Sequence, residues 1–157
     1  SAKVLNQLVL LEQEDPKQGI TVFINSPGGE IFSGFAIFDM LKFIECPITT
    51  VVTGFAASMG SVLSLAADEG RRFAMPQAKI MIHQPMGGAQ GQASDMEITL
   101  TEILKLKKEL YSIIAHHSGQ PFDKVEADSD RDYWMTSGEA KEYGMVDEIL
   151  LGKSQAK

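Results

Sequence analysis

Residues 48–61 read ITTVVTGFAASMGS, and this stretch decides the fold class. Its first six residues are all β-branched, which favours a buried strand over residues 48–53. Small residues then dominate, and they predict a short helix that begins at Ser58, continues to about Asp68 and stops at Gly70. A strand, a tight turn and a helix in this order are the building unit of α/β proteins.

The same order of elements recurs on both sides of this stretch. ITVFIN (residues 20–25) predicts another buried strand, SPGG (residues 26–29) breaks it, and apolar residues at helical spacing predict a helix over residues 33–45. An earlier helix ends at Asp15 and Pro16, whereas RRFAM and AKIMIH predict strands over residues 71–75 and 78–83. The chain is therefore expected to be one α/β domain over residues 1–157.

The second half adds a long helix. QPMGGAQGQ (residues 84–92) is polar and rich in glycine, and apolar spacing then predicts a helix over about residues 95–117 that ends at Gly119. Thr136 and Glu139 form a capping box for a helix that ends at Gly144, and MVDEIL (residues 145–150) predicts a closing strand. Residues 151–157 are expected to be a frayed tail. Because the chain opens inside a helical pattern, we expect that residues once preceded Ser1.

Composition and charge exclude several classes of function. The formal net charge of -7 and the sequence pI near 4.9 argue against binding to nucleic acid or to anionic membrane. No apolar run approaches the roughly 20 residues that span a bilayer. Cys46 is the only cysteine, so no internal disulfide can form, which suits a reducing compartment. Its setting favours a semi-buried thiol over a nucleophile, and the sequence predicts no metal site.

Ser58 allows two interpretations. It lies beyond the carboxyl end of a predicted strand, where α/β proteins bind ligands. As an N-cap it would only satisfy a helix N–H group, with the small residues around it serving close packing. As a nucleophile it would use the N–H groups and the dipole of the helix start to stabilise an oxyanion. The stretch lacks the GxSxG spacing of a nucleophile elbow, and SPGGEIFSG lacks the lysine of a nucleotide-binding loop.

A serine nucleophile requires a base and a group that orients the base. His83 ends an apolar strand and is the candidate base. His116 and His117 lie at the C-terminal end of the long helix, where a partly charged imidazole interacts favourably with the helix dipole. Both are therefore interpreted as structural. The residues alone do not choose an acid among Asp128, Asp130 and Asp132. From the residues alone, the most specific function that we infer is a hydrolase that uses a serine and a histidine.

Four motifs carry a resemblance to a known family. INSPGGEIFSG, GFAASMGS, IMIHQPMGGAQGQASD and DRDYWMTSGEAKEYGMVDEIL together resemble the Clp protease proteolytic subunits, over about residues 5–150. The resemblance implies a spiral fold of β-β-α units, shared with the crotonases, from which a strand and a helix protrude as a handle. That handle matches residues 84–92 and 95–117.

The resemblance also implies site residues for a serine endopeptidase. Ser58 matches the nucleophile, His83 the general base and Asp132 the residue that orients the histidine. The N–H groups of Gly29 and Met59 match the oxyanion hole. An extended peptide would lie between GGEIF and MGGAQ and pair through its backbone. The implied substrate-binding residues are Gly28, Gly29, Glu30, Ile31, Pro85, Met86 and Gly87.

Family members assemble into two stacked seven-membered rings around a chamber where unfolded polypeptides are cut to short peptides. The resemblance implies the same here, as a homo-oligomer or as a ring mixed with paralogues, with Arg131, Gln90 and Gln92 at the ring–ring contact. It implies an AAA+ ATPase unfoldase such as ClpX, ClpA or ClpC as partner, no cofactor, and a bacterial-type cytoplasmic location, with an organelle matrix or stroma as the alternative. The family's N-terminal axial segment and first strand are not found before Ser1.

Two alternatives remain open at this point. A crotonase-like enzyme acting on acyl-CoA thioesters would share the spiral fold and a backbone oxyanion hole without needing all three side chains. A catalytically inactive paralogue would serve as a scaffold in a mixed ring.

Overall fold

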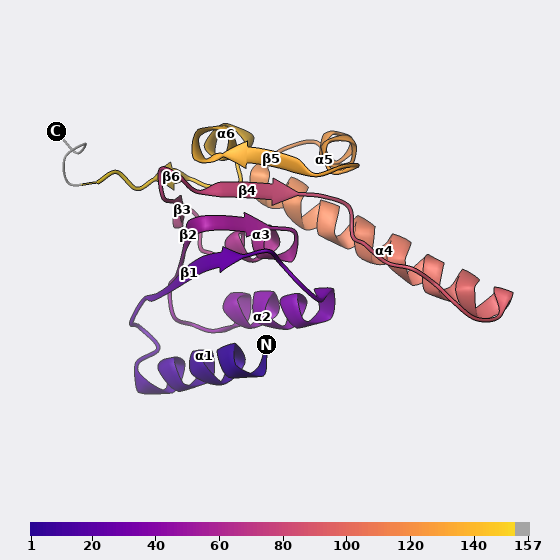
Figure 1. The fold of residues 1–157 in the computed structure, drawn as a ribbon. Coiled ribbons are helices and arrows are strands. Elements are labelled where there is room, and N and C mark those ends of the chain that lie inside the picture. The colour runs from indigo at the N-terminus through magenta and orange to yellow at the C-terminus, as the bar shows by residue number, and fades with distance from the viewer. Residues whose placement is uncertain (153–157) are drawn as a thin grey trace.

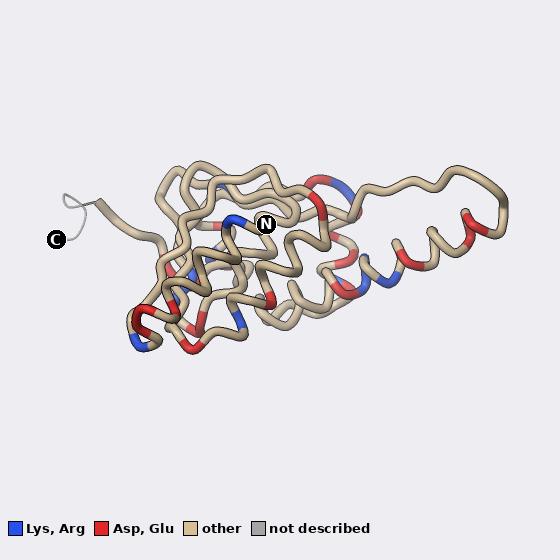
Figure 2. Tube along the Cα trace, turned by 90° about the horizontal axis from the view of Figure 1, so that it is seen from below, with Lys and Arg blue, Asp and Glu red and all other residues tan. Residues whose placement is uncertain are grey.

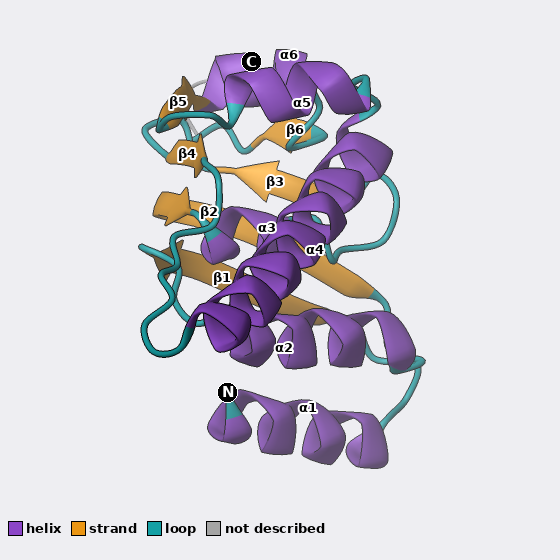
Figure 3. Cartoon of the chain, turned by 90° about the vertical axis from the view of Figure 1, so that its right-hand side faces the viewer, coloured by secondary structure: helices purple, strands orange, loops and turns teal. Residues whose placement is uncertain are grey.

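The computed structural model describes residues 1–152, which form a mixture of helices and strands (Figure 1). In chain order they are α1 (Ala2–Glu14), β1 (Ile20–Ser26), α2 (Ile31–Phe43), β2 (Ile48–Ala57), α3 (Met59–Ser64), β3 (Arg72–Ala74), β4 (Lys79–Ile82), α4 (Ala93–Ser118), α5 (Phe122–Asp128), β5 (Tyr133–Thr136), α6 (Ser137–Tyr143) and β6 (Glu148–Ile149). In two perpendicular views α1, α2, β1 and β2 follow one another along one axis, with α6 at the far end (Figures 1 and 3). The predicted α/β spiral is confirmed.

Strand β2 organises the sheet. It pairs in parallel with β1 along one side, from Ile20 opposite Ile48. Its first half, around Val51, pairs with β3, and its last three residues, around Ala56, pair with β4. β6 extends the β3 side, whereas β5 adds to β4 as an antiparallel strand. The sheet therefore curls, because β2 exchanges one neighbour for another along its length.

A bulge marks the point where β2 changes neighbours. Ile24 pairs with Val52 and Ser26 with Ala56, so three residues of β2 lie opposite Asn25 alone. The side-chain Oδ1 of Asn25 accepts a hydrogen bond from the Phe55 N–H group at 3.3 Å. Gly54 adopts φ 67°, and a Cβ there would lie 2.7 Å from that same oxygen. Glycine is required, because it alone fits both the left-handed conformation and the space.

The core lies between the curled sheet and the helices that cover it. α3 packs on β2 and contacts α2 and the C-terminal part of α4. The side chains of Val52, Leu65, Ile80 and Tyr111 are almost completely buried there. Because the core side chains come from distant parts of the chain, they fix the end of β2 relative to the end of β4.

Helix α4 protrudes from this body as a handle (Figures 1 and 2). Its predicted apolar stripe packs on the core only near its C-terminus, at Leu110 and Ile114, whereas Met96 and Leu100 are exposed. Charged residues of both signs follow the helix, whereas residues 84–92, which lead outward to its start, include none (Figure 2). Residues 84–92 were expected to form a strand of the handle, but they form none. Strands require a hydrogen-bonded neighbour, and within residues 1–152 no strand lies beside them.

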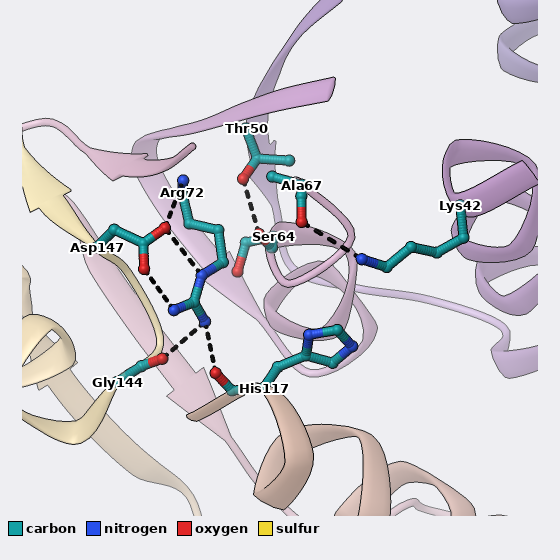
Figure 4. A network of polar contacts seen from close by, with 8 residues as sticks. All are labelled: Lys42, Thr50, Ser64, Ala67, Arg72, His117, Gly144 and Asp147. Carbon is teal, nitrogen blue, oxygen red and sulfur yellow. Dashed lines mark hydrogen bonds and ion pairs between the residues drawn. The ribbon is translucent and has the colours of Figure 1, made fainter. Parts of the chain in front are cut away.

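Arg72 anchors the base of the handle (Figure 4). Its guanidinium binds both carboxylate oxygens of Asp147, at 3.1 Å from Nε and 2.6 Å from Nη2. Nη1 donates to the carbonyl oxygens of His117 and Gly144, at 2.9 and 2.8 Å. These two carbonyls belong to the C-terminal ends of α4 and α6, where helices lack internal donors. One side chain therefore joins β3, both helix ends and the segment before β6.

Several predicted boundaries are wrong for local reasons. α2 starts at Ile31 rather than at residue 33, because the Glu30 carboxylate caps it by accepting from the N–H groups of Phe32 and Ser33 at 2.8 and 2.7 Å. β2 runs on to Ala57, and α3 ends at Ser64 instead of continuing to about residue 68.

Elements whose stability comes from distant partners also differ from the prediction. α5 and β5 were not predicted, and the closing strand shrinks to the two residues of β6. Of the tail expected to fray, Leu151 and Gly152 are exposed and lie outside helices and strands, and residues 153–157 lie outside the described residues.

Candidate active site

Ser58 occupies the sharp turn between β2 and α3. Its backbone adopts φ 55° and ψ −126°, and Ser58 is the one non-glycine residue within residues 1–152 that has a positive φ. Such a conformation costs on the order of 1–3 kcal/mol and persists only where the surroundings enforce it. Two hydrogen bonds hold this backbone: Ser58 N–H donates to the Met81 carbonyl at 2.9 Å, and the Ser58 carbonyl accepts from Ser61 N–H at 3.0 Å.

The side chain of Ser58 is not a helix cap. Ser58 stands at the N-cap position of α3, but its side chain makes no capping hydrogen bond. The N-cap interpretation is therefore wrong for the side chain. Instead Ser58 Oγ lies 2.7 Å from Nε2 of His83, which follows the end of β4.

His83 is held between Ser58 and an aspartate. Its Nδ1 lies 3.0 Å from Oδ1 of Asp132. The antiparallel pairing of β4 with β5 explains this contact, since Ile82 is opposite Tyr133 and the next pair outward is His83 and Asp132. An imidazole that donates from Nδ1 to the carboxylate accepts at Nε2 from the serine hydroxyl. The three groups therefore lie in the order in which a carboxylate orients an imidazole and the imidazole can accept the serine proton.

The geometry also distinguishes among the three candidate aspartates. Oδ2 of Asp128 accepts from Tyr143 Oη at 2.9 Å and from Lys124 Nζ at 2.6 Å. Within residues 1–152 the Asp130 carboxylate has one charged partner, Arg131, at 4.0 Å. Asp132 alone reaches His83.

The SPGG segment lies against the Ser58 turn. Gly28 has φ 95°, and a Cβ there would lie 2.7 Å from the Ala57 carbonyl and 2.8 Å from Ser58 Cβ. Gly29 beside it has open space where a side chain would be. The N–H groups of Gly29 and Met59 donate no hydrogen bond within residues 1–152, so both can bind a ligand oxygen near Ser58.

A pocket of about 390 Å³ opens beside Ser58. Of the seven predicted substrate-binding residues, five line it, namely Gly28, Gly29, Ile31, Pro85 and Met86. The other two are used elsewhere: Glu30 caps α2, and Gly87 lies against Ile103 of the handle helix.

Sequence reasoning missed the apolar wall of this pocket. Val62, Leu110 and Ile114 line it, from α3 and from the base of α4. The sequence did contain one indication of this wall, the four-residue spacing of Leu110 and Ile114. That spacing places both side chains on the same face of a helix, but it does not show which part of the protein that face packs against.

The remaining candidates lie away from Ser58. Cys46 is buried, and burial raises the pKa of its thiol, which fits the unreactive thiol expected. Burial also lowers the pKa of His117 to about 4, with Lys42 adding to the effect. The expectation of a partly charged imidazole at His117 is therefore wrong, because a histidine with that pKa is neutral at pH 7. The ring packs edge-on against Phe38.

The predicted ring–ring residues are accessible. The Arg131 side chain is 91% exposed, and Gln90 and Gln92 are exposed on the segment leading into α4. None of the helices in residues 1–152 combines the length and the apolarity needed to cross a lipid bilayer.

An α/β fold that lines up a serine hydroxyl, an imidazole and a carboxylate beside free N–H groups defines the class of serine hydrolases. Comparison with known proteins narrows the class. A family model described as Clp protease matches residues 1–153. This chain belongs to the Clp protease family, and it is a serine-type peptidase.

Bacterial relatives named ATP-dependent Clp protease proteolytic subunit match over most of the chain. One from Bacteroides fragilis is 61% identical over 147 residues, which cover 94% of this chain and 71% of the relative. One from Bacteroides thetaiotaomicron is 60% identical over 147 residues, covering 94% and 67%. One from Porphyromonas gingivalis is 56% identical over 144 residues, covering 92% and 65%.

Proposed function

We propose that this chain is the proteolytic subunit of an ATP-dependent Clp protease and cleaves unfolded polypeptides with Ser58 as nucleophile, His83 as general base and Asp132 as the residue that orients the imidazole. The observation that carries the proposal is the continuous array of contacts, 2.7 Å from Ser58 Oγ to His83 Nε2 and 3.0 Å from His83 Nδ1 to Asp132 Oδ1.

Acylation follows from this array. His83 Nε2 takes the hydroxyl proton as Ser58 Oγ attacks the peptide carbonyl carbon, and Asp132 stabilises the imidazolium. The oxyanion lies between the N–H groups of Gly29 and Met59. His83 then protonates the leaving amine, the C–N bond breaks, and the acyl group stays on Ser58. Loss of one such N–H donor typically costs about 10²–10³ in rate.

Deacylation repeats the steps with water. His83 takes a proton from a water molecule, whose oxygen attacks the ester carbonyl. The tetrahedral intermediate collapses, the proton returns to Ser58 Oγ, and the new carboxyl end leaves.

The surroundings of Ser58 suggest how a peptide binds. Residues 27–30 and 83–90 lie on either side of the site without strand partners within residues 1–152, so each offers backbone groups to an extended peptide. Backbone pairing does not read side chains, which favours broad tolerance. The apolar pocket beside Ser58, walled by Val62, Leu110 and Ile114, favours an apolar side chain next to the cleaved bond.

Assembly and partners belong to the same proposal. We infer two stacked heptameric rings, homomeric or mixed, with Arg131, Gln90 and Gln92 at the ring–ring contact. The exposed apolar side chains of Met96, Ile98, Leu100 and Leu104 on α4 support an association through the handle. An AAA+ ATPase unfoldase would supply unfolded chain and the energy of ATP, and the complex would work in a bacterial-type cytoplasm.

Peptide hydrolysis tests the proposal. We expect the purified protein to cleave a fluorogenic peptide and Ser58→Ala to lose roughly 10⁴–10⁶ in kcat. Ser112→Ala is the control, since that residue is exposed on α4 and its hydroxyl has one hydrogen-bond partner within residues 1–152, the Lys108 carbonyl. A fluorophosphonate should label wild type and not Ser58→Ala, at a native mass near fourteen subunits. Equal activity of wild type and Ser58→Ala would refute the nucleophile, and absent labelling in an assembled particle would favour an acyl-CoA enzyme or an inactive scaffold.

A further inference from the structure

The segment that carries Asp132 is held by its backbone and not by its carboxylate. The Asp132 side chain is 63% exposed, and its one hydrogen-bond partner in residues 1–152 is His83. An exposed carboxylate has no packing to fix its rotamer. Its place beside the imidazole therefore depends on where the main chain puts it.

The two ends of this segment are held differently. On the C-terminal side, Tyr133 enters β5 and pairs with Ile82. On the N-terminal side the segment leaves α5, where Ser129 N–H donates to the Val125 carbonyl at 2.9 Å, but Asp130 N–H reaches the Ala127 carbonyl only at 3.4 Å. The helix alone therefore holds Asp130 weakly, and a second anchor is needed close to Asp132.

Gln84 supplies this anchor. Its backbone N–H donates to the Ser129 carbonyl at 2.6 Å, and its side-chain Nε2 donates to the Asp130 carbonyl at 2.8 Å. One residue therefore binds two consecutive carbonyls, which lie three and two residues before Asp132. Gln84 also follows His83 directly. The two hydrogen bonds therefore couple the position of the His83 backbone to the position of the segment that leads to Asp132.

We propose that Gln84 is a positioning residue that holds the segment 129–132 so that the Asp132 carboxylate meets the His83 imidazole. The proposal rests on the proposed roles of His83 and Asp132. Side-chain length and a donor are both required: methionine matches the length of glutamine but cannot donate, and asparagine is one methylene shorter. A misplacement of about 1 Å in such a site is enough to cost up to about 10²-fold in rate.

The chain contains a matched control. Gln120 also donates its Nε2 to a main-chain carbonyl, that of Tyr143, at 2.9 Å and away from Ser58. Gln84→Met and Gln120→Met therefore delete the same kind of bond. If Gln84 only stabilised the fold, both variants would behave alike.

Steady-state kinetics with a fluorogenic peptide give the first test. We expect Gln84→Met to lower kcat roughly 10–100-fold with KM within about twofold, at unchanged native mass, while Gln120→Met keeps the wild-type kcat. In an Asp132→Asn background, Gln84→Met should change kcat by less than about twofold, because the group it positions is already altered. Equal effects of the two glutamine variants, or independent effects of Gln84→Met and Asp132→Asn, would overturn the proposal.

Hydrogen exchange gives a test that needs no activity. The amides of residues 129–133 should exchange faster in Gln84→Met than in wild type, and at the wild-type rate in Gln120→Met. Unchanged exchange in Gln84→Met would overturn the positioning role even if peptide cleavage is normal. A wild-type protein that cleaves nothing, with faster exchange in Gln84→Met, would instead refute the proposed function and leave the anchor in place.

Discussion

Replacement of Arg72 by methionine should destabilise the fold more than any other change to an exposed or half-buried cation in the described chain. The side chain joins four segments, and methionine keeps much of its length while losing every donor (Figure 4). In Arg72→Met, Oδ1 of Asp147 loses its guanidinium partner, and Oδ2 loses the Nε donor but keeps the backbone N–H of residue 72, at 2.9 Å. The carbonyls of His117 and Gly144 lose their donor as well.

The size of the expected loss in unfolding free energy depends on how deeply the Arg72–Asp147 pair is buried. The Arg72 and Asp147 side chains are 13% and 24% exposed, so the pair lies between the surface and the interior. Removal of one partner of a fully buried pair costs about 3–5 kcal/mol, whereas exposed pairs contribute about 0–1 kcal/mol. Because water reaches part of the carboxylate, we expect Arg72→Met to lower the free energy of unfolding by roughly 2–4 kcal/mol.

Urea denaturation at one fixed protein concentration measures this loss, since assembly makes stability concentration-dependent. Arg71→Met is the control: the neighbouring residue is exposed, and within residues 1–152 its guanidinium makes one hydrogen bond, 3.5 Å to Thr49 Oγ1, so the loss should stay below about 0.5 kcal/mol. The double variant Arg72→Met with Asp147→Leu should recover part of the stability, because it leaves no unpaired charge. Equal losses for Arg71→Met and Arg72→Met would refute the reasoning.

The same pair predicts a dependence on pH. Burial alone would raise the pKa of the Asp147 carboxyl, but hydrogen bonds from Arg72 outweigh it and hold that pKa below its ordinary value. A lowered folded-state pKa stabilises the fold above the unfolded-state value of about 3.9, and the contribution disappears as pH falls through the folded-state value. The difference between wild type and Arg72→Met should therefore shrink below about pH 4.

Two further predictions concern backbone strain and a buried imidazole. Gly54→Ala should lower the free energy of unfolding by about 2–4 kcal/mol, whereas Gly70→Ala should lower it by about 1 kcal/mol. Both glycines have positive φ, but only a Cβ added at residue 54 would collide with Asn25. Equal losses for the two variants in thermal denaturation would contradict the predicted clash. His117 should titrate near pH 4 by NMR, because burial lowers its pKa from 6.5. The unfolded chain then binds its proton first, so stability should fall as pH drops from about 6.5 to 4. A midpoint near 6.5 would exclude this burial effect.

The sequence by itself determined the elements whose signal is local. β-branched runs located β1 and β2, helical spacing located α2 and α4, and the capping box at Thr136 located α6 with its stop at Gly144. Strand-end positions also marked Ser58 and His83 as candidates. These signals are local because propensity, caps and positive-φ glycines act within a few residues.

The resemblance to a family supplied what local signals could not. Reasoning from residues left Asp128, Asp130 and Asp132 equivalent, since all three stand in one acidic segment. Only the match to DRDYWM named Asp132, and the Clp protease family model and relatives confirm the family behind that match.

Only the tertiary structure decided which side chains meet. The antiparallel register of β4 and β5 places Asp132 opposite His83. Tyr133, Trp134 and Thr136 are residue types that favour strands, but propensity does not specify the partner strand or the register. The bulge opposite Asn25, the rotation of the Ser58 side chain away from its helix, and the apolar wall from α4 have the same origin. Each depends on contacts between residues more than twenty positions apart, which periodicity along the chain does not encode.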